Sequence, residues 1–258
     1  MGNLDQNLMV ALVTGTFVGA AAGYLGSLMI IKKMALVGDA LSHVALPGIA
    51  IAIMFQLNPF IGAFIFLALA VIGIWILDQR SETGMETLIG IFFTASLSIG
   101  IILTKEIDLL ESLFGDLSRL TNMDAILGIV LSLITIAITY KISRDVLLGT
   151  ISKDLASSAG VNVAKTDFIF LFLVATIVAL GIKIAGTLLT GALVIIPAAA
   201  ARNISENFKS FSWLSLILGS TSSILGILIS DKFLSPPGPT IVLVGTVIFL
   251  VTFLNRNN

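Results

Sequence analysis

Long apolar runs recur along the whole chain and limit the folds it can adopt. They occupy residues 8–31, 34–55, 60–77, 85–104, 123–140, 168–182, 184–201, 213–230 and 240–254, and polar segments separate them. A helix needs roughly 20 apolar residues to cross the hydrocarbon core of a bilayer. Backbone that spans lipid must satisfy its own hydrogen bonds, as a helix does. The runs therefore predict an all-α bundle of transmembrane helices, formed as a single domain over residues 1–258.

The composition agrees with a polytopic membrane protein in contact with lipid. Hydrophobic residues make up 57% of the chain and charged residues only 11%, against about 25% charged in soluble domains. The net charge of −1 gives no attraction toward nucleic acid. Because cysteine is absent, disulfides and thiolate metal sites are excluded. The first residues, MGNLDQN, lack the basic region of a signal peptide, so we expect the first run to be retained as a span.

The number of spans is eight or nine, and the orientation depends on it. Lys183 separates residues 168–182 from 184–201, and one bent span over both would reduce nine to eight. With nine spans and an outside N-terminus, ten Lys and Arg residues lie in inside segments and four in outside segments. Positive residues favour the cytoplasmic side. This orientation predicts that the longest polar interruption, residues 141–167, is cytoplasmic, and the sequence DLASSAG within it predicts a short helix ended by Gly160.

Residues 34–55 hold the most unusual side chains of the chain. Asp39 and His43, the single histidine, are four positions apart and so share one face of a helix. Pro47 has no N–H, which leaves the carbonyl of His43 without its helical partner, and Gly38 offers a second kink point. His43 lies roughly 15 Å into the predicted span at 1.5 Å per residue, close to the bilayer midplane.

Two interpretations of this pair are open. Asp39 and His43 could hydrogen-bond to each other and join two helices, as polar pairs do in membranes. A charged group at the bilayer centre costs about 2.5–3.5 kcal/mol, however, so such residues usually serve a function. Carboxylate and imidazole suit Zn²⁺, Mn²⁺ or Fe²⁺. Two side chains do not complete a coordination shell, but two copies facing each other across an axis would supply two Asp and two His.

Four other segments each allow two interpretations. A stripe of glycines serves close helix packing within the chain or a homodimer seam, and a run of small residues around Pro197 serves packing or lines a pathway. The acidic residues of segment 105–122 belong to a solvated loop or attract cations. The turn SDKFLSPPGP connects two spans or docks a partner. The glycines are Gly15, Gly19 and Gly23, the small-residue run is 186–201, the acidic residues are Glu106, Asp108, Glu111 and Asp116, and the turn is 230–239.

Motifs that would make this chain an enzyme are missing. It contains no GxxxxGK[ST] phosphate-binding loop and no HExxH zinc motif. We therefore expect no catalytic residue and no bound cofactor, and any ATP hydrolysis would take place on a separate subunit.

The stretch MALVGDALSHVALPGIAIA resembles the signature of the metal-permease family of ATP-binding-cassette importers. LLESLFGDL, DLASSAGVN and GTLLTGALVIIPAAAA with the following SPPGP turn agree with that family in the same order. The resemblance implies a type II importer-like permease in a prokaryotic cell membrane that transports zinc, manganese or iron(II). It also implies a homodimer, two cytoplasmic ATPase subunits and an extracytoplasmic metal-binding protein.

The resemblance also assigns roles to residues. Asp39 and His43 fall where the family has its pathway carboxylate and histidine, and Asp154, Ala156 and Gly160 fall in the cytoplasmic helix that docks on the ATPase. The chain departs from the family's Ala-Thr-Ala after the proline, because residues 199–201 are all alanine.

Two functions of other classes compete with the permease. The first is an ion-coupled secondary metal transporter with Asp39 and His43 as a proton relay. The second is a membrane-embedded structural subunit, which would leave the Asp–His pair without a use.

Overall fold

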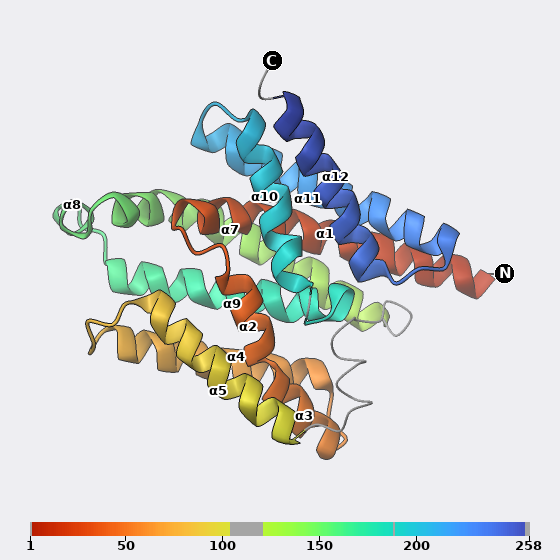
Figure 1. Ribbon diagram of the computed structural model, residues 1–258, viewed down its shortest axis with the longest axis horizontal. Coiled ribbons are helices and arrows are strands. Elements are labelled where there is room, and N and C mark those ends of the chain that lie inside the picture. The colour runs from red at the N-terminus through yellow and green to blue at the C-terminus, as the bar shows by residue number, and fades with distance from the viewer. Residues whose placement is uncertain (1, 104–120, 188, 256–258) are drawn as a thin grey trace.

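The computed structural model describes residues 2–103, 121–187 and 189–255, and the described residues are almost entirely helical (Figure 1). No β-strand occurs among them, which confirms the all-α prediction. The helices are α1 (Gly2–Ile31), α2 (Val37–Val44), α3 (Leu46–Met54), α4 (Pro59–Asp78), α5 (Met85–Leu103), α7 (Asn122–Ile151), α8 (Lys153–Ser158), α9 (Val163–Ala185), α10 (Thr190–Ile204), α11 (Phe208–Phe233) and α12 (Pro237–Asn255).

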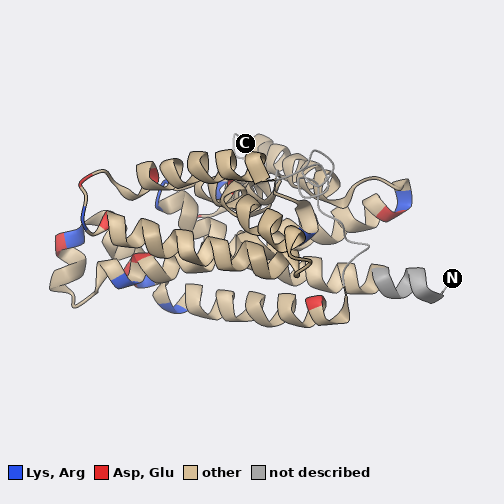
Figure 2. Ribbon diagram, turned by 90° about the horizontal axis from the view of Figure 1, so that it is seen from below, with Lys and Arg blue, Asp and Glu red and all other residues tan. Residues whose placement is uncertain are grey.

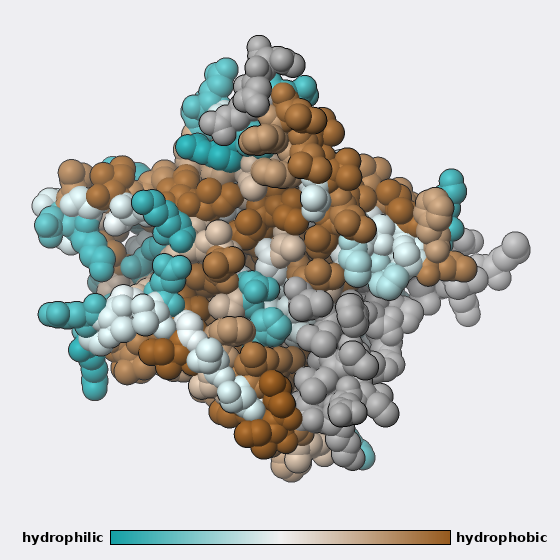
Figure 3. Space-filling model, in the orientation of Figure 1, coloured by the Kyte–Doolittle hydropathy of each residue, from teal (hydrophilic) through white to brown (hydrophobic). Residues whose placement is uncertain are grey.

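Eight helical segments among the described residues are long and apolar enough to cross a membrane, with α2 and α3 counted as one segment. α10 is a further apolar helix of 15 residues, about 22 Å long at 1.5 Å per residue. Large hydrophobic side chains cover much of the outer surface, as the brown areas of Figure 3 show. The chain is a multi-pass membrane protein, as its composition predicts.

The bundle has two distinct ends along its long axis. α8 lies at one end and the N-terminus at the other, and we call these the α8 end and the N-terminal end (Figure 1). Most of the charged residues drawn in Figure 2 lie toward the α8 end. The polar segment 141–167 lies at this end and is mostly helical. It forms the last turns of α7, all of α8 and the first turn of α9. Gly160, with φ of 78°, follows the end of α8 as predicted.

The glycine stripe packs α1 against α11. A Cβ on Gly19 would lie 2.2 Å from Ser223 Oγ and 2.6 Å from the carbonyl oxygen of Gly219, so only glycine permits this approach. One turn further along, a Cβ on Gly23 would meet the carbonyl of Ser215. The stripe therefore serves packing within the chain and is not a free homodimer seam.

The predicted break at Lys183 is wrong by a few residues. α9 continues through Lys183 to Ala185 and ends at Gly186, where φ is 78°. Lys183 stays inside the helix because it forms an ion pair with Asp124 of α7 and lies 4.9 Å from the ring centre of Phe60. The charge has partners, so it does not interrupt the helix. α10 then starts at Thr190 and is separate from α9. With 15 residues it is not one of the eight segments long enough to cross a membrane, so the choice between eight and nine passes, and the orientation that depends on it, stay predictions.

α7 is longer than the predicted span 123–140 because it continues through the charged residues after Tyr140 to Ile151. At its start, Thr121 and Asp124 form a reciprocal capping box. The predicted acidic segment 105–122 lies outside the described residues except for its last two positions, so its two interpretations stay open.

Candidate functional site

The predicted span 34–55 is two helices joined at a break. α2 ends at Val44 and α3 begins at Leu46 with Pro47 in its first turn, where a missing N–H is tolerated. The carbonyl of His43 is not left open as expected, because the amide of Ala45 donates to it. Gly38 lies in the first turn of α2 and is buried, so the break falls near Pro47 rather than at Gly38.

Asp39 and His43 both lie on α2, one turn apart. Asp39 is exposed and His43 is half-buried. The His43 ring packs against Phe93 of α5, with ring centres 5.5 Å apart. Its Nδ1 atom is buried and has no hydrogen-bond partner among the described residues. A buried polar atom without a partner costs about 1–3 kcal/mol, so this nitrogen is suited to a ligand that the chain itself does not provide.

The surface around α2 is unusual for a membrane protein. Figure 3 shows a small hydrophilic patch near the centre of a largely hydrophobic face, in the region where Figure 1 draws α2 and the start of α10. No group of three or more His, Cys, Asp or Glu residues that could hold a metal occurs in the described part of the chain. The described part of one chain therefore brings a single imidazole and a single carboxylate to this place, fewer groups than a closed metal site needs.

α10 packs directly on the start of α2. A Cβ on Gly191 would lie 2.7 Å from Asp39 Cβ and 2.8 Å from Asp39 Cα, so the two backbones are in close contact. The hydroxyl of Ser42 lies 2.6 Å from the carbonyl oxygen of Thr187 in the α9–α10 connection. Neither Ser42 nor Gly191 stands out in the sequence, although both lie inside motifs that do, GDALSH and the small-residue run 186–201. In that run Pro197 is buried inside α10.

The residues predicted to contact an ATPase lie at the α8 end, but they differ in exposure. Asp154 and Gly160 are exposed, whereas Ala156 is fully buried and presents no surface to a partner. Apolar side chains are exposed beside it instead: Leu155 is 55% exposed and Ile151 is 76% exposed. Ser152 caps α8 by accepting a hydrogen bond from the amide of Leu155.

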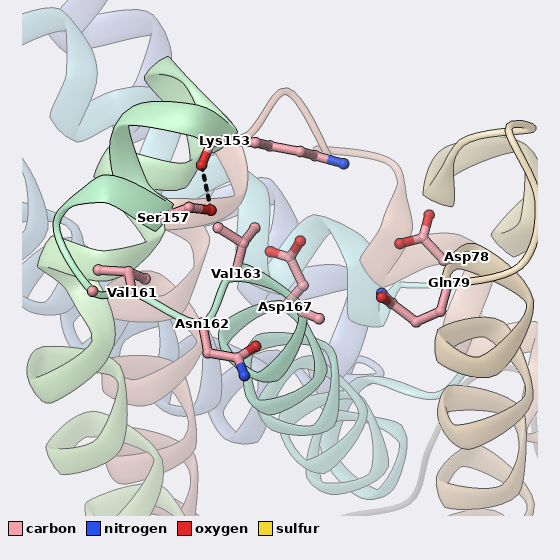
Figure 4. A pocket seen from close by; sticks show the side chains of 10 residues that line it. Asp78, Gln79, Lys153, Ser157, Val161, Asn162, Val163 and Asp167 are labelled. Atoms are coloured by element: carbon pink, nitrogen blue, oxygen red, sulfur yellow. Dashed lines mark hydrogen bonds between the residues drawn. The ribbon is translucent and has the colours of Figure 1, made fainter.

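A cleft of about 520 Å³ opens beside α8. Figure 4 shows it between the end of α4, which carries Asp78 and Gln79, and the side chains of α8 and α9. Lys153 extends over the gap (Figure 4), and Asp167, which also lines the cleft, is paired at 2.5 Å with Lys32, the residue that follows α1. The cleft is therefore polar and is bounded by the ion pair that joins the segment after α1 to α9.

The model of the ABC 3 transport family matches residues 4–256 of this chain. The chain is 33% identical to the manganese transport system membrane protein MntC of Listeria monocytogenes over 251 residues, which cover 96% of this chain and 90% of MntC. It is also 33% identical to the high-affinity zinc uptake system membrane protein ZnuB of Haemophilus influenzae, with 96% and 97% of the two chains covered.

Among solved structures, PsaBC from Streptococcus pneumoniae in complex with Fab contains a chain of the same fold. The TM-score is 0.82 at 32% sequence identity, and the match covers 96% of this chain and 91% of that chain. These matches confirm the resemblance carried by the GDALSH stretch and the three later motifs. Because the family model matches almost the whole chain, the protein belongs to the ABC 3 transport family.

Proposed function

We propose that this chain is the membrane-spanning permease subunit of an ATP-binding-cassette importer that moves a divalent transition metal ion into the cytoplasm. MntC and ZnuB, which it resembles over nearly its full length, carry manganese and zinc transport in their names. The observation in this molecule that carries the proposal is the buried Nδ1 of His43, which no described residue hydrogen-bonds, one turn from the exposed carboxylate of Asp39.

The donor atoms at α2 match this cargo. Imidazole nitrogen and carboxylate oxygen are ligands of Zn²⁺, Mn²⁺ and Fe²⁺, whereas Cu⁺ prefers the cysteine that this sequence lacks. A transported ion must be bound well enough to leave water and weakly enough to be released. Two ligands per chain fit such a transient stop better than a closed structural site would.

A second copy of the chain would complete the coordination shell. Asp39 is exposed on α2, a helix whose other residues are apolar or small except for Ser42 and His43. A membrane protein must cover an exposed carboxylate of this kind or line a water-filled path with it. Two copies related by a two-fold axis would supply two carboxylates and two imidazoles, the number of ligands that tetrahedral Zn²⁺ takes. We therefore include a homodimer in the proposal.

The energy would come from ATPase subunits that bind at the α8 end. α8 is exposed on most of its residues, and the apolar side chains of Leu155 and of Ile151, at the end of α7, are exposed at this end of the bundle. α8 follows directly on α7, a continuous helix of 30 residues, so a displacement of α8 is transmitted along the bundle. The extracytoplasmic metal-binding protein would dock at the opposite, N-terminal end, where the cargo enters.

The proposal is tested by transport in proteoliposomes that contain the permease with its ATPase. We expect uptake of radioactive manganese or zinc that requires ATP, and His43→Ala and Asp39→Asn should abolish it while the protein amount and oligomeric state persist. Asp231→Asn, which changes an exposed carboxylate on α11, is the matched control and should transport normally. Uptake by the permease alone, driven by an ion gradient, would instead support the secondary transporter.

A further inference from the structure

We propose that Ser42 and Gly191 are positioning residues for the metal site. They fix α2 to the start of α10 and thereby set where Asp39 and His43 stand relative to the transported ion. This inference rests on the proposed function of Asp39 and His43, and it names two residues that do not themselves bind the metal.

Ser42 joins α2 to Thr187, between α9 and α10, by a hydrogen bond. Its side chain is fully buried, and its hydroxyl oxygen lies 2.7 Å from the carbonyl oxygen of Asp39 and 2.6 Å from that of Thr187. A hydroxyl carries one hydrogen, so it donates to one of these carbonyls at a time or shares its hydrogen between them. One side chain thus joins the backbone of a proposed metal ligand to the segment that precedes α10.

Gly191 sets how closely α10 approaches the same ligand. A side chain there would meet the N, Cα and Cβ atoms of Asp39, all within 2.8 Å. These atoms belong to the helix backbone or are attached to it, so they cannot swing away as the tip of a flexible side chain can. Replacing Gly191 by alanine must therefore displace α2 from α10 and move the Asp39 carboxylate.

Both contacts hold α2: Ser42 bonds to Thr187 just before α10, and Asp39 packs on Gly191 in the first turn of α10. Thr190 Oγ1 donates to the carbonyl of Gly186 at 2.6 Å, which joins the first residue of α10 to the residue that follows α9. This hydrogen bond fixes the start of α10, on which α2 packs. Residues that orient the ligands of a metal typically change its affinity about 10–100-fold when they are replaced.

Geometry also separates the two cargoes named for the relatives. Zn²⁺ favours a tetrahedral set, whereas Mn²⁺ favours a larger octahedral set rich in oxygen. A displacement of α2 should therefore change the half-saturating concentrations for Zn²⁺ and Mn²⁺ by different factors. A merely structural residue would lower the amount of folded protein and the maximal rate for both ions alike.

The experiment measures ATP-driven uptake of Mn²⁺ and of Zn²⁺ by the permease–ATPase complex in proteoliposomes, for Ser42→Ala and Gly191→Ala. We expect the half-saturating concentration for at least one ion to rise about 10–100-fold, with a changed ratio between the two ions. Ser27→Ala and Gly226→Ala are the matched controls. Ser27 is a fully buried serine bonded to Ser212 of α11, and a Cβ on Gly226 would meet the backbone of Ile241 in α12.

Unchanged half-saturating concentrations in Ser42→Ala, with at most a lower maximal rate as in Ser27→Ala, would overturn the inference. If Gly191→Ala does not fold, Ser42→Ala alone decides, since it removes a single atom. Asp39→Asn and His43→Ala are measured in parallel. If these two transport normally, the proposed function fails; if they lose transport while Ser42→Ala and Gly191→Ala match their controls, only the positioning role fails.

Discussion

Leu155 is the residue whose replacement tests the proposed ATPase contact most simply. It stands on α8, is 55% exposed and lies beside the fully buried Ala156. Complete burial of a leucine side chain stabilises by about 1.5–3 kcal/mol. Roughly half of that, about 0.8–1.6 kcal/mol, is left for a partner to gain by covering the exposed part. Since 1.4 kcal/mol corresponds to a factor of ten, Leu155→Ala should weaken ATPase binding roughly 4- to 15-fold per docking site.

The assay is a titration of the ATPase subunit onto the detergent-solubilised permease, followed by ATP hydrolysis measured in the reconstituted complex. We expect a higher Kd and weaker coupling of hydrolysis to uptake for Leu155→Ala. Leu234→Ala is the matched control, since Leu234 is 94% exposed but follows α11 at the opposite end. If both variants bind the ATPase as the unaltered chain does, α8 does not provide an apolar docking contact.

Three further substitutions test the fold that holds the site. Lys183→Met removes a partly buried ion pair with Asp124 and should lower the free energy of unfolding by about 1–3 kcal/mol, between the values for exposed and buried pairs. In thermal unfolding in detergent, adding Asp124→Asn to Lys183→Met should lower the stability little further. A fully additive loss of stability would contradict the pairing. Gly19→Ala should destabilise by about 1–3 kcal/mol through overpacking. Gly90→Ala, where a Cβ meets nothing within 4 Å of its place inside α5, should leave the unfolding midpoint unchanged or raise it, because alanine favours a helix. Equal midpoints for the two variants would refute the tight α1–α11 contact. Pro47→Ala restores a helical N–H at the α2–α3 break and should lower the uptake rate at normal protein amount, so unaltered uptake would show that the break is not needed.

The spans could be predicted from the sequence because each depends mainly on local hydrophobicity. The glycine stripe of α1 and the short helix ended by Gly160 could also be predicted from the sequence, since small-residue spacing and a left-handed glycine are local signals. The end of α9 could not be predicted, because Lys183 remains helical only through its ion pair with Asp124, which is 59 positions away in the chain. A charged residue in an apolar run predicts the end of a helix unless its ion-pair partner is known.

In the candidate site, too, local features could be predicted from the sequence and contacts between distant segments could not. The spacing of Asp39 and His43 predicts that they share a helix face, and α2 carries both. The contact of Gly191 with Asp39 joins two segments of different helices, and nothing local to either segment marks it. Likewise, the motif DLASSAG contains Ala156, but only the packing of α8 reveals that this residue faces inward while Leu155 faces outward. Tertiary contacts decide which residues of a motif are accessible.

The most direct test of the proposed function is the coordination of the cargo at α2. X-ray absorption spectroscopy on the purified permease–ATPase complex loaded with Zn²⁺, and electron paramagnetic resonance on the Mn²⁺-loaded complex, report the ligands of the bound ion. We expect imidazole nitrogen in the first shell of the unaltered complex and its loss in His43→Gln, with weaker binding in Asp39→Asn. A bound metal whose spectrum is the same in the unaltered protein and in His43→Gln would contradict a metal site at His43.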